Sequence, residues 1–369
     1  MHIITRNLLR LLRTGLFLQE ETIEPMSAWK WQRMGQYAAM HDVTSLVYRG
    51  MAMSRSQFFA NTTDTIDQQW RQRAQMLRDR QAQLWKALAP LTADLTALQL
   101  RPVLLGPLAM SLAYEMRADR QATAIDLFFP YETKAHKAEQ WAWEHGTDTA
   151  MADHNTMTYT LNGIAVRHHR QLLPLSNALH ARTLAAIVGD EFRESRPTFA
   201  DIDNQRVELP QPTLLLLRQM LAVAEDVLSN GVHLGRLADI AVFLRREGHR
   251  VDFVKLQQWT ERLRLGPMAQ LQGNLLCSLL GLSADEVPFM DADAAFDPTP
   301  FADALFDRKG SSAEWQLRQA TGDVFVSAVG SKAMLRQVRH SARHMRYYPT
   351  EGLAVLTAAF AHSLSDIEE

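Results

Sequence analysis

The sequence predicts an α+β protein in which a small mixed-sheet core lies between mainly helical N- and C-terminal segments. Strong helix formers with apolar residues three or four apart fill residues 1–98 and 173–284. Residues 99–172 instead alternate short β-rich runs with helical spacing, which indicates a compact α/β unit. Residues 285–369 begin with an acidic, proline-punctuated stretch typical of a linker, continue through a candidate strand at 323–330 and end in basic helices.

The composition is that of an ordinary globular protein. Hydrophobic residues make up 47% and charged residues 22% of the 369 positions, enough for a core and for two or three domains. The formal net charge of −2 gives no overall attraction to polyanions. The single cysteine, Cys277, excludes an intrachain disulfide framework and fits a reducing compartment.

The sequence gives no sign of a membrane segment or a secretion signal. Apolar runs stay below the roughly 18 residues that a membrane span needs. Arg6, Arg10 and Arg13 interrupt the N-terminal leucines, a pattern that predicts an amphipathic helix rather than a signal peptide. We therefore expect a cytoplasmic protein with no membrane partner.

The strongest local signal is a β-hairpin around Asn162-Gly163. These residues tolerate the positive φ angles of a type I′ turn, and alternating runs flank them. We expect strands near Met157–Leu161 and Ile164–His168 to pair antiparallel. They should join a sheet that contains Val103–Leu105 and Ile125–Phe129.

One acidic residue, Asp126, interrupts the apolar run "AIDLFF". A buried carboxylate is costly unless a cation or hydrogen-bond donors accompany it. Asp126 is therefore either a salt-bridged residue near a strand end or the remainder of a metal or phosphate site.

The order of motifs in the core resembles a known family, the large uncharacterised bacterial nucleotidyltransferases. Its pattern runs from a strand ending in glycine, through a helix and an arginine, to an Asp-x-Asp strand, then to a strand with a third acid and a helical segment. The matching stretches are "LLGPLAMSLAY" (104–114), Arg120, "AIDLFF" (124–129), "VRHH" (166–169) and "LGRLADIAVFL" (234–244). The resemblance covers roughly residues 27–283.

The resemblance implies two-metal phosphoryl chemistry. In such a site, carboxylates from neighbouring strands hold Mg²⁺, which prefers hard oxygen ligands and neutralises a triphosphate. It assigns Asp126 as a catalytic and metal-binding residue, and Gly106, Arg120 and Arg167 as nucleotide- or phosphate-binding residues. Mg²⁺ is the implied cofactor if the protein is active, and a nucleoside triphosphate or another phosphate-bearing small molecule is the implied partner.

Three positions depart from the family pattern. Ala124 stands at the first aspartate, Arg167 at the third carboxylate, and Leu105 at the lysine before the glycine. Because one carboxylate cannot hold two divalent ions, we expect a degenerate or weakly active acid triad. An arginine fork matches a carboxylate well, so we expect the Arg167 guanidinium to replace the lost cation and to pair with Asp126.

Other polar residues leave further interpretations open. His168 and His169 fall on opposite faces of one strand and are not expected to bind a metal together. Asp239 is expected to make a polar contact that orients its helix. Five basic residues at three- and four-residue spacing form a stripe on one helix face, which is either a nucleic-acid site or an ordinary solvated face. The members of the stripe are Lys332, Arg336, Arg339, Arg343 and Arg346. The alternative to nucleotide or phosphate binding near Asp126 is a non-catalytic helical interaction or scaffold protein.

Overall fold

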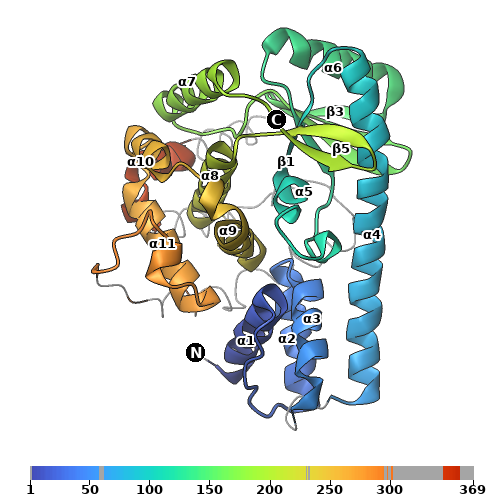
Figure 1. The fold of residues 1–369 in the computed structure, drawn as a ribbon, viewed down its shortest axis with the longest axis vertical. Helices are drawn as coiled ribbons and strands as arrows, with labels where there is room; N and C mark the ends of the chain where they lie inside the picture. The colour runs from blue at the N-terminus through green and yellow to red at the C-terminus, as the bar shows by residue number, and fades with distance from the viewer. Residues whose placement is uncertain are drawn as a thin grey trace, which may run out of the picture.

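A mixed sheet forms the centre of the protein, with helices around it (Figure 1). The computed structural model describes the chain apart from residues 1, 58–61, 230, 232, 295–296, 298–300, 302–343 and 358–369. Within the described residues the sheet has seven strands in the order β3-β4-β5-β2-β1-β7-β6. Their bounds are β1 Val103–Leu105, β2 Ile125–Phe128, β3 Thr147–Asp153, β4 Thr156–Leu161, β5 Ile164–His169, β6 Thr198–Ile202 and β7 Gln205–Leu209. The predicted α+β class is confirmed.

The hairpin expected at Asn162-Gly163 is present. β4 and β5 pair antiparallel with Leu161 opposite Ile164, and both turn residues have positive φ, 51° and 77°. β5 pairs parallel with β2, which pairs antiparallel with β1. The four strands predicted for the core therefore lie side by side in one sheet.

Three strands were not predicted. The β6–β7 hairpin lies within residues 173–284, which were expected to be helical, and β7 extends the sheet by pairing parallel with β1. Its turn uses Asp203 and Asn204, both with positive φ, so the Asn-Gly signal is absent. β3 is an exposed edge strand whose sequence shows no apolar alternation.

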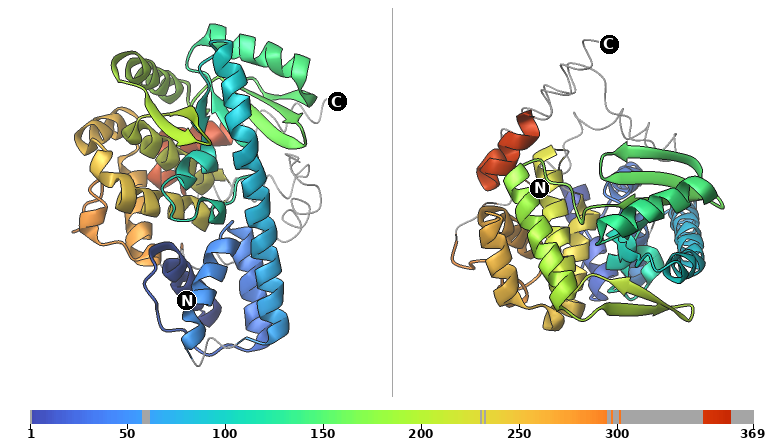
Figure 2. Two further views of the ribbon diagram at one scale, coloured as in Figure 1. Left: turned by 45° about the vertical axis from the view of Figure 1, so that its right-hand side comes forward. Right: turned by 90° about the horizontal axis from the view of Figure 1, so that it is seen from above.

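The helices enclose this sheet and extend away from it (Figure 2). α4 packs against α3 and also reaches β5 and β7, and with 34 residues it is roughly 50 Å long. The helix bounds are α1 Ile3–Phe17, α2 Ala28–Met40, α3 Thr44–Met53, α4 Asp64–Ala97, α5 Gly106–Ser111, α6 Glu132–His145, α7 Ala178–Glu194, α8 Pro212–Ser229, α9 Leu234–Glu247, α10 Phe253–Arg262 and α11 Gly266–Leu280.

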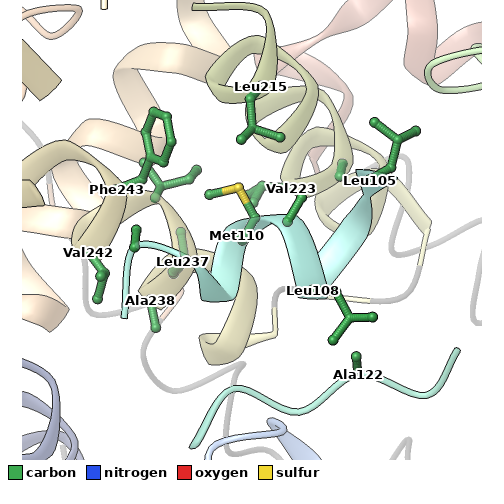
Figure 3. Packing of buried hydrophobic residues seen from close by; sticks show 14 of the residues in the cluster. Leu105, Leu108, Met110, Ala122, Leu215, Val223, Leu237, Ala238, Val242 and Phe243 are labelled. Carbon is green, nitrogen blue, oxygen red and sulfur yellow. The ribbon is translucent and has the colours of Figure 1, made fainter. Parts of the chain in front are cut away.

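The core joins the sheet to the C-terminal helices through α5. Figure 3 shows Met110 of α5 among side chains of α8 and α9, including Leu215, Leu237 and Phe243. α8 is apolar almost all round, which is typical of a helix buried on every side. α6 covers the other face of the sheet by packing on β3, β4 and β5.

The C-terminal predictions are only partly within the described residues. The candidate strand at 323–330 and Lys332, Arg336, Arg339 and Arg343 of the basic stripe lie outside them. Arg346 lies in a 3-10 turn, Met345–Tyr347, and its guanidinium covers the ring of Tyr347. The stripe as a nucleic-acid site stays a prediction. Among the described helices, none has the length and hydropathy needed to cross a membrane.

Candidate functional site

Asp126 forms a two-point ion pair with Arg167. The two residues are register partners on the neighbouring parallel strands β2 and β5. Arg167 Nε donates to Asp126 Oδ1 at 2.8 Å, and Nη2 donates to Oδ2 at 3.2 Å. This is the fork geometry that suits a guanidinium and a carboxylate. The pairing expected from the sequence is confirmed.

A third residue, His169, completes the contact and was missed by the sequence analysis. Its Nε2 lies 2.8 Å from Asp126 Oδ1. Because an ionised carboxylate only accepts, Nε2 carries the hydrogen. Thr156 on β4 lies opposite His169, with its hydroxyl 3.5 Å from Nδ1. The signal was available in the sequence, since a residue two positions beyond Arg167 on a strand shares its face.

The surroundings keep Asp126 ionised. Burial alone would raise the pKa of this carboxyl, which is 5% exposed, but Arg167, His169 and Arg218 hold it well below its ordinary value. Arg218 comes from α8, and its Nε donates to the backbone oxygen of Leu172 at 3.2 Å. Burial lowers the pKa of Arg218 to about 10, and Asp126 only partly offsets this. We call Asp126, Arg167, His169 and Arg218 the Asp126 cluster.

Gly106 is required next to the carboxylate. It begins α5 with φ of +68°, and a Cβ at this position would lie 2.5 Å from Asp126 Oδ2. The glycine thus satisfies both a left-handed backbone and a close approach of the Asp126 side chain. The structure shows this contact between Gly106 and Asp126, and the predicted contact of Gly106 with phosphate stays a prediction.

Replacing Gly106 by alanine is expected to destabilise the protein by about 2 kcal/mol or more, because a positive φ and a close contact must both be accommodated. Gly189→Ala in α7 is the matched control, since a Cβ there meets nothing within 4 Å. That change should be neutral or stabilising by up to about 1 kcal/mol. Urea unfolding measures the free energy of unfolding of both variants. Equal stability of the two variants would refute the role given to Gly106.

Arg120 is buried and pairs with a carboxylate of α9, and its predicted contact with phosphate stays a prediction. Its side chain is 4% exposed, and it donates to Asp239 from Nε at 2.6 Å and from Nη2 at 2.8 Å. Tyr114 and Gln219 donate to the same carboxylate at 2.8 and 3.1 Å. Burial would lower the pKa of Arg120, but Asp239 raises it overall.

This network explains part of the family pattern in structural terms. Tyr114, Arg120 and Asp239 stand in three of the motifs quoted above, and together they tie α9 to the segment that follows α5. The expectation that Asp239 makes a helix-orienting polar contact is confirmed.

His168 belongs to the core rather than to the site. It is 1% exposed, and its Nε2 lies 2.9 Å from the hydroxyl of Tyr159. Burial and the neighbouring His169 lower the pKa of His168 to about 3, so the imidazole is neutral at pH 7. The expected opposite orientation of His168 and His169 is confirmed.

The residues around Asp126 do not fit a two-Mg²⁺ centre. Ala124 offers no ligand, and the guanidinium of Arg167 occupies the carboxylate that a metal would need. The described residues contain no group of three or more histidine, cysteine or acidic side chains placed to hold a metal ion. No step of a mechanism can therefore be assigned to Mg²⁺ here.

Comparisons with known proteins give a family for most of the chain. A family described as uncharacterised nucleotidyltransferase matches residues 27–281. No curated protein matches the sequence. A solved structure, an antigenic nucleotidyltransferase-like protein from Paracoccidioides brasiliensis, is similar at 15% identity and a TM-score of 0.35, over 53% of this chain and 91% of that one. Since the family match spans well over half of the residues, the chain belongs to the family of uncharacterised nucleotidyltransferases.

Proposed function

We propose that this nucleotidyltransferase-family protein binds a phosphate-bearing ligand at the Asp126 cluster without Mg²⁺, as a degenerate member of its family. The observation that carries the proposal is the Arg167–Asp126 fork, because it puts a permanent cation where the family pattern has a metal-binding acid. A nucleotide is the ligand class that the family suggests.

The balance of charge in the cluster supports an anion. One carboxylate faces two guanidinium groups and an imidazole, so the cluster has a net positive charge even when His169 is neutral. Burial is the main cause of the lowered pKa of Arg218, and the attraction of Asp126 and Glu225 offsets it only in part. A bound phosphate would add negative charge and accept hydrogen bonds from the guanidinium groups.

Two threonines of β4 border the cluster. Thr156 and Thr158 lie opposite His169 and Arg167 on the same face of the sheet. Both hydroxyls already have partners, which are His169 Nδ1 for Thr156 and the backbone oxygen of Ala150 for Thr158. The hydrogen-bond donors for a phosphate therefore come from the charged side chains of β5 and α8.

The test is calorimetric titration with inorganic tripolyphosphate in EDTA. The natural sequence should bind, and Arg218→Gln should weaken binding about 10- to 100-fold, because one charged donor contributes about 1.5–3 kcal/mol. Arg182→Gln, an exposed arginine on α7, is the matched control and should leave affinity unchanged.

Three results would count against the proposal. Binding that requires Mg²⁺ would instead favour a metal-dependent enzyme. An Arg218→Gln protein that binds as tightly as the natural sequence would place the anion elsewhere. No binding of any phosphate compound would favour the scaffold alternative, in which the Arg167–Asp126 pair serves only stability.

A further inference from the structure

We infer that a cleft between α4 and the β4–β5 turn binds the uncharged ring of the phosphate-bearing ligand, a base or a sugar, beside the Asp126 cluster. This inference rests on the proposed function and adds a second contact site to it. We call this site the α4 cleft. One wall is formed by Thr123 and the turn residues 163–165. The other wall is formed by α4, with Arg71, Gln72, Gln75, Met76, Asp79, Arg80, Gln83 and Leu84.

The size of the cleft suits a small ligand. Its volume is about 800 Å³, within the range of typical ligand sites. α4 contacts β5 directly, and Figure 1 shows the strand beside the upper half of the helix. A Cβ added to Gly163, whose φ is +77°, would meet no atom within 4 Å. The turn therefore borders open space.

The uncharged side chains of the α4 cleft suit a ring with hydrogen-bonding groups, and Arg71, Asp79 and Arg80 add charges of both signs beside them. Gln72, Gln75 and Gln83 are exposed carboxamides, and each offers both a donor and an acceptor. Met76 is 63% exposed between them and gives an adaptable apolar surface. Bases and sugars combine ring surface with donors and acceptors in this way, whereas a bare phosphate would use neither feature.

Thr123 connects the α4 cleft to the Asp126 cluster. It lines the cleft, and its hydroxyl accepts a hydrogen bond from Arg167 Nη2 at 3.3 Å. Ala165 also lines the cleft and lies on the same face of β5 as Arg167. Thr123 thus contacts both sites, and a ligand with a phosphate end and a ring end can extend from one to the other.

The helical wall is held in place by buried polar contacts. Gln81 of α4 bonds the backbone oxygen and nitrogen of Ala122 at 2.9 and 3.0 Å. Arg78 donates to the buried Asp119 at 2.6 Å. These contacts fix α4 against the segment that carries Thr123, so the cleft is formed before a ligand arrives.

The experiment compares ligands with and without a ring in the natural sequence and in Gln72→Ala/Gln83→Ala. The four ribonucleoside triphosphates are measured against tripolyphosphate, and glucose 1-phosphate is measured against inorganic phosphate, all in EDTA. At least one ring-bearing ligand should bind about 10-fold or more tightly than its ring-free counterpart, as expected for a gain of about 1.4 kcal/mol. Gln72→Ala/Gln83→Ala should remove that gain and leave binding of the ring-free compound unchanged.

The control variant is Gln68→Ala/Gln69→Ala, which changes two exposed glutamines of α4 outside the cleft and should keep the gain. A gain with nucleotides alone identifies a base, and a gain with glucose 1-phosphate identifies a sugar. If tripolyphosphate binds but no ring adds affinity, or if the gain survives Gln72→Ala/Gln83→Ala, the α4 cleft is refuted and the proposed function stands. If neither kind of compound binds, both are refuted.

Discussion

Ala124→Asp/Arg167→Glu is expected to give the protein a Mg²⁺ site. The double substitution places carboxylates at the two positions where the family pattern has acids, next to Asp126. It also removes the guanidinium that now occupies the Asp126 carboxylate. Three oxygen ligands from adjacent strand positions are then available to a hard divalent cation.

Mg²⁺ should stabilise the double variant and leave the stability of the natural sequence unchanged. In EDTA the variant should lose several kcal/mol, because three carboxylates then lie together without a cation, and Asp126 is 5% exposed. Mg²⁺ at about 100 times its dissociation constant should restore about 2.7 kcal/mol. The natural sequence should unfold at the same temperature in EDTA and in Mg²⁺. Thermal unfolding measures both proteins.

Single substitutions separate the contributions. Ala124→Asp alone keeps the Arg167 fork on Asp126, so Mg²⁺ should raise its stability little. Arg167→Glu alone removes the fork, so Mg²⁺ should raise its stability by less than in the double variant but by more than in Ala124→Asp. Strong Mg²⁺ stabilisation of the natural sequence would contradict the interpretation that Arg167 replaces the metal.

The Arg167–Asp126 pair was predictable because the family resemblance implied that the two positions meet, and local rules then fixed the strand faces. Asn162-Gly163 fixes the register of β5, and the alternation of side chains along a strand then fixes which residues share a face. An isolated buried carboxylate needs a partner, and Arg167 was the suitable residue at the matching position. The same rules applied two residues further would have found His169.

Arg218 and the α4 cleft were not predictable, because tertiary packing positions them. α8 is apolar almost all round, so its sequence does not indicate which side faces the sheet. The exposed residues of α4 look like an ordinary solvated face in the sequence. The contacts of α4 with β5 and β7, together with the hydrogen bonds of the buried Gln81 to Ala122, show that one side of this helix lies against the core.

The pairing of Arg120 with Asp239 was not predicted for a related reason. A motif position gives a residue type but not its partner, and the partner, Asp239, lies on α9 far along the chain. The β6–β7 hairpin was missed because its strands are short and its turn lacks glycine.

Asp239→Ala is expected to cost about 3–5 kcal/mol of unfolding free energy, as measured by urea unfolding at pH 7. Asp239 is 1% exposed and accepts hydrogen bonds from Arg120, Tyr114 and Gln219. Removing it leaves a buried guanidinium without its carboxylate, and the cost of that unpaired charge dominates the effect. The matched control, Glu247→Ala, breaks the exposed pair with Arg250 and should cost less than about 1 kcal/mol.

A second variant, Arg120→Met/Asp239→Leu, separates the unpaired charge from the loss of packing. Replacing both members of a buried ion pair by apolar residues avoids the unpaired charge, so the double variant should be more stable than Asp239→Ala. It should still be less stable than the natural sequence, because the Tyr114 hydroxyl loses its acceptor. If Asp239→Ala instead costs no more than Glu247→Ala, the network does not hold α9 to the core. If the double variant is the less stable of the two, packing rather than charge governs the site.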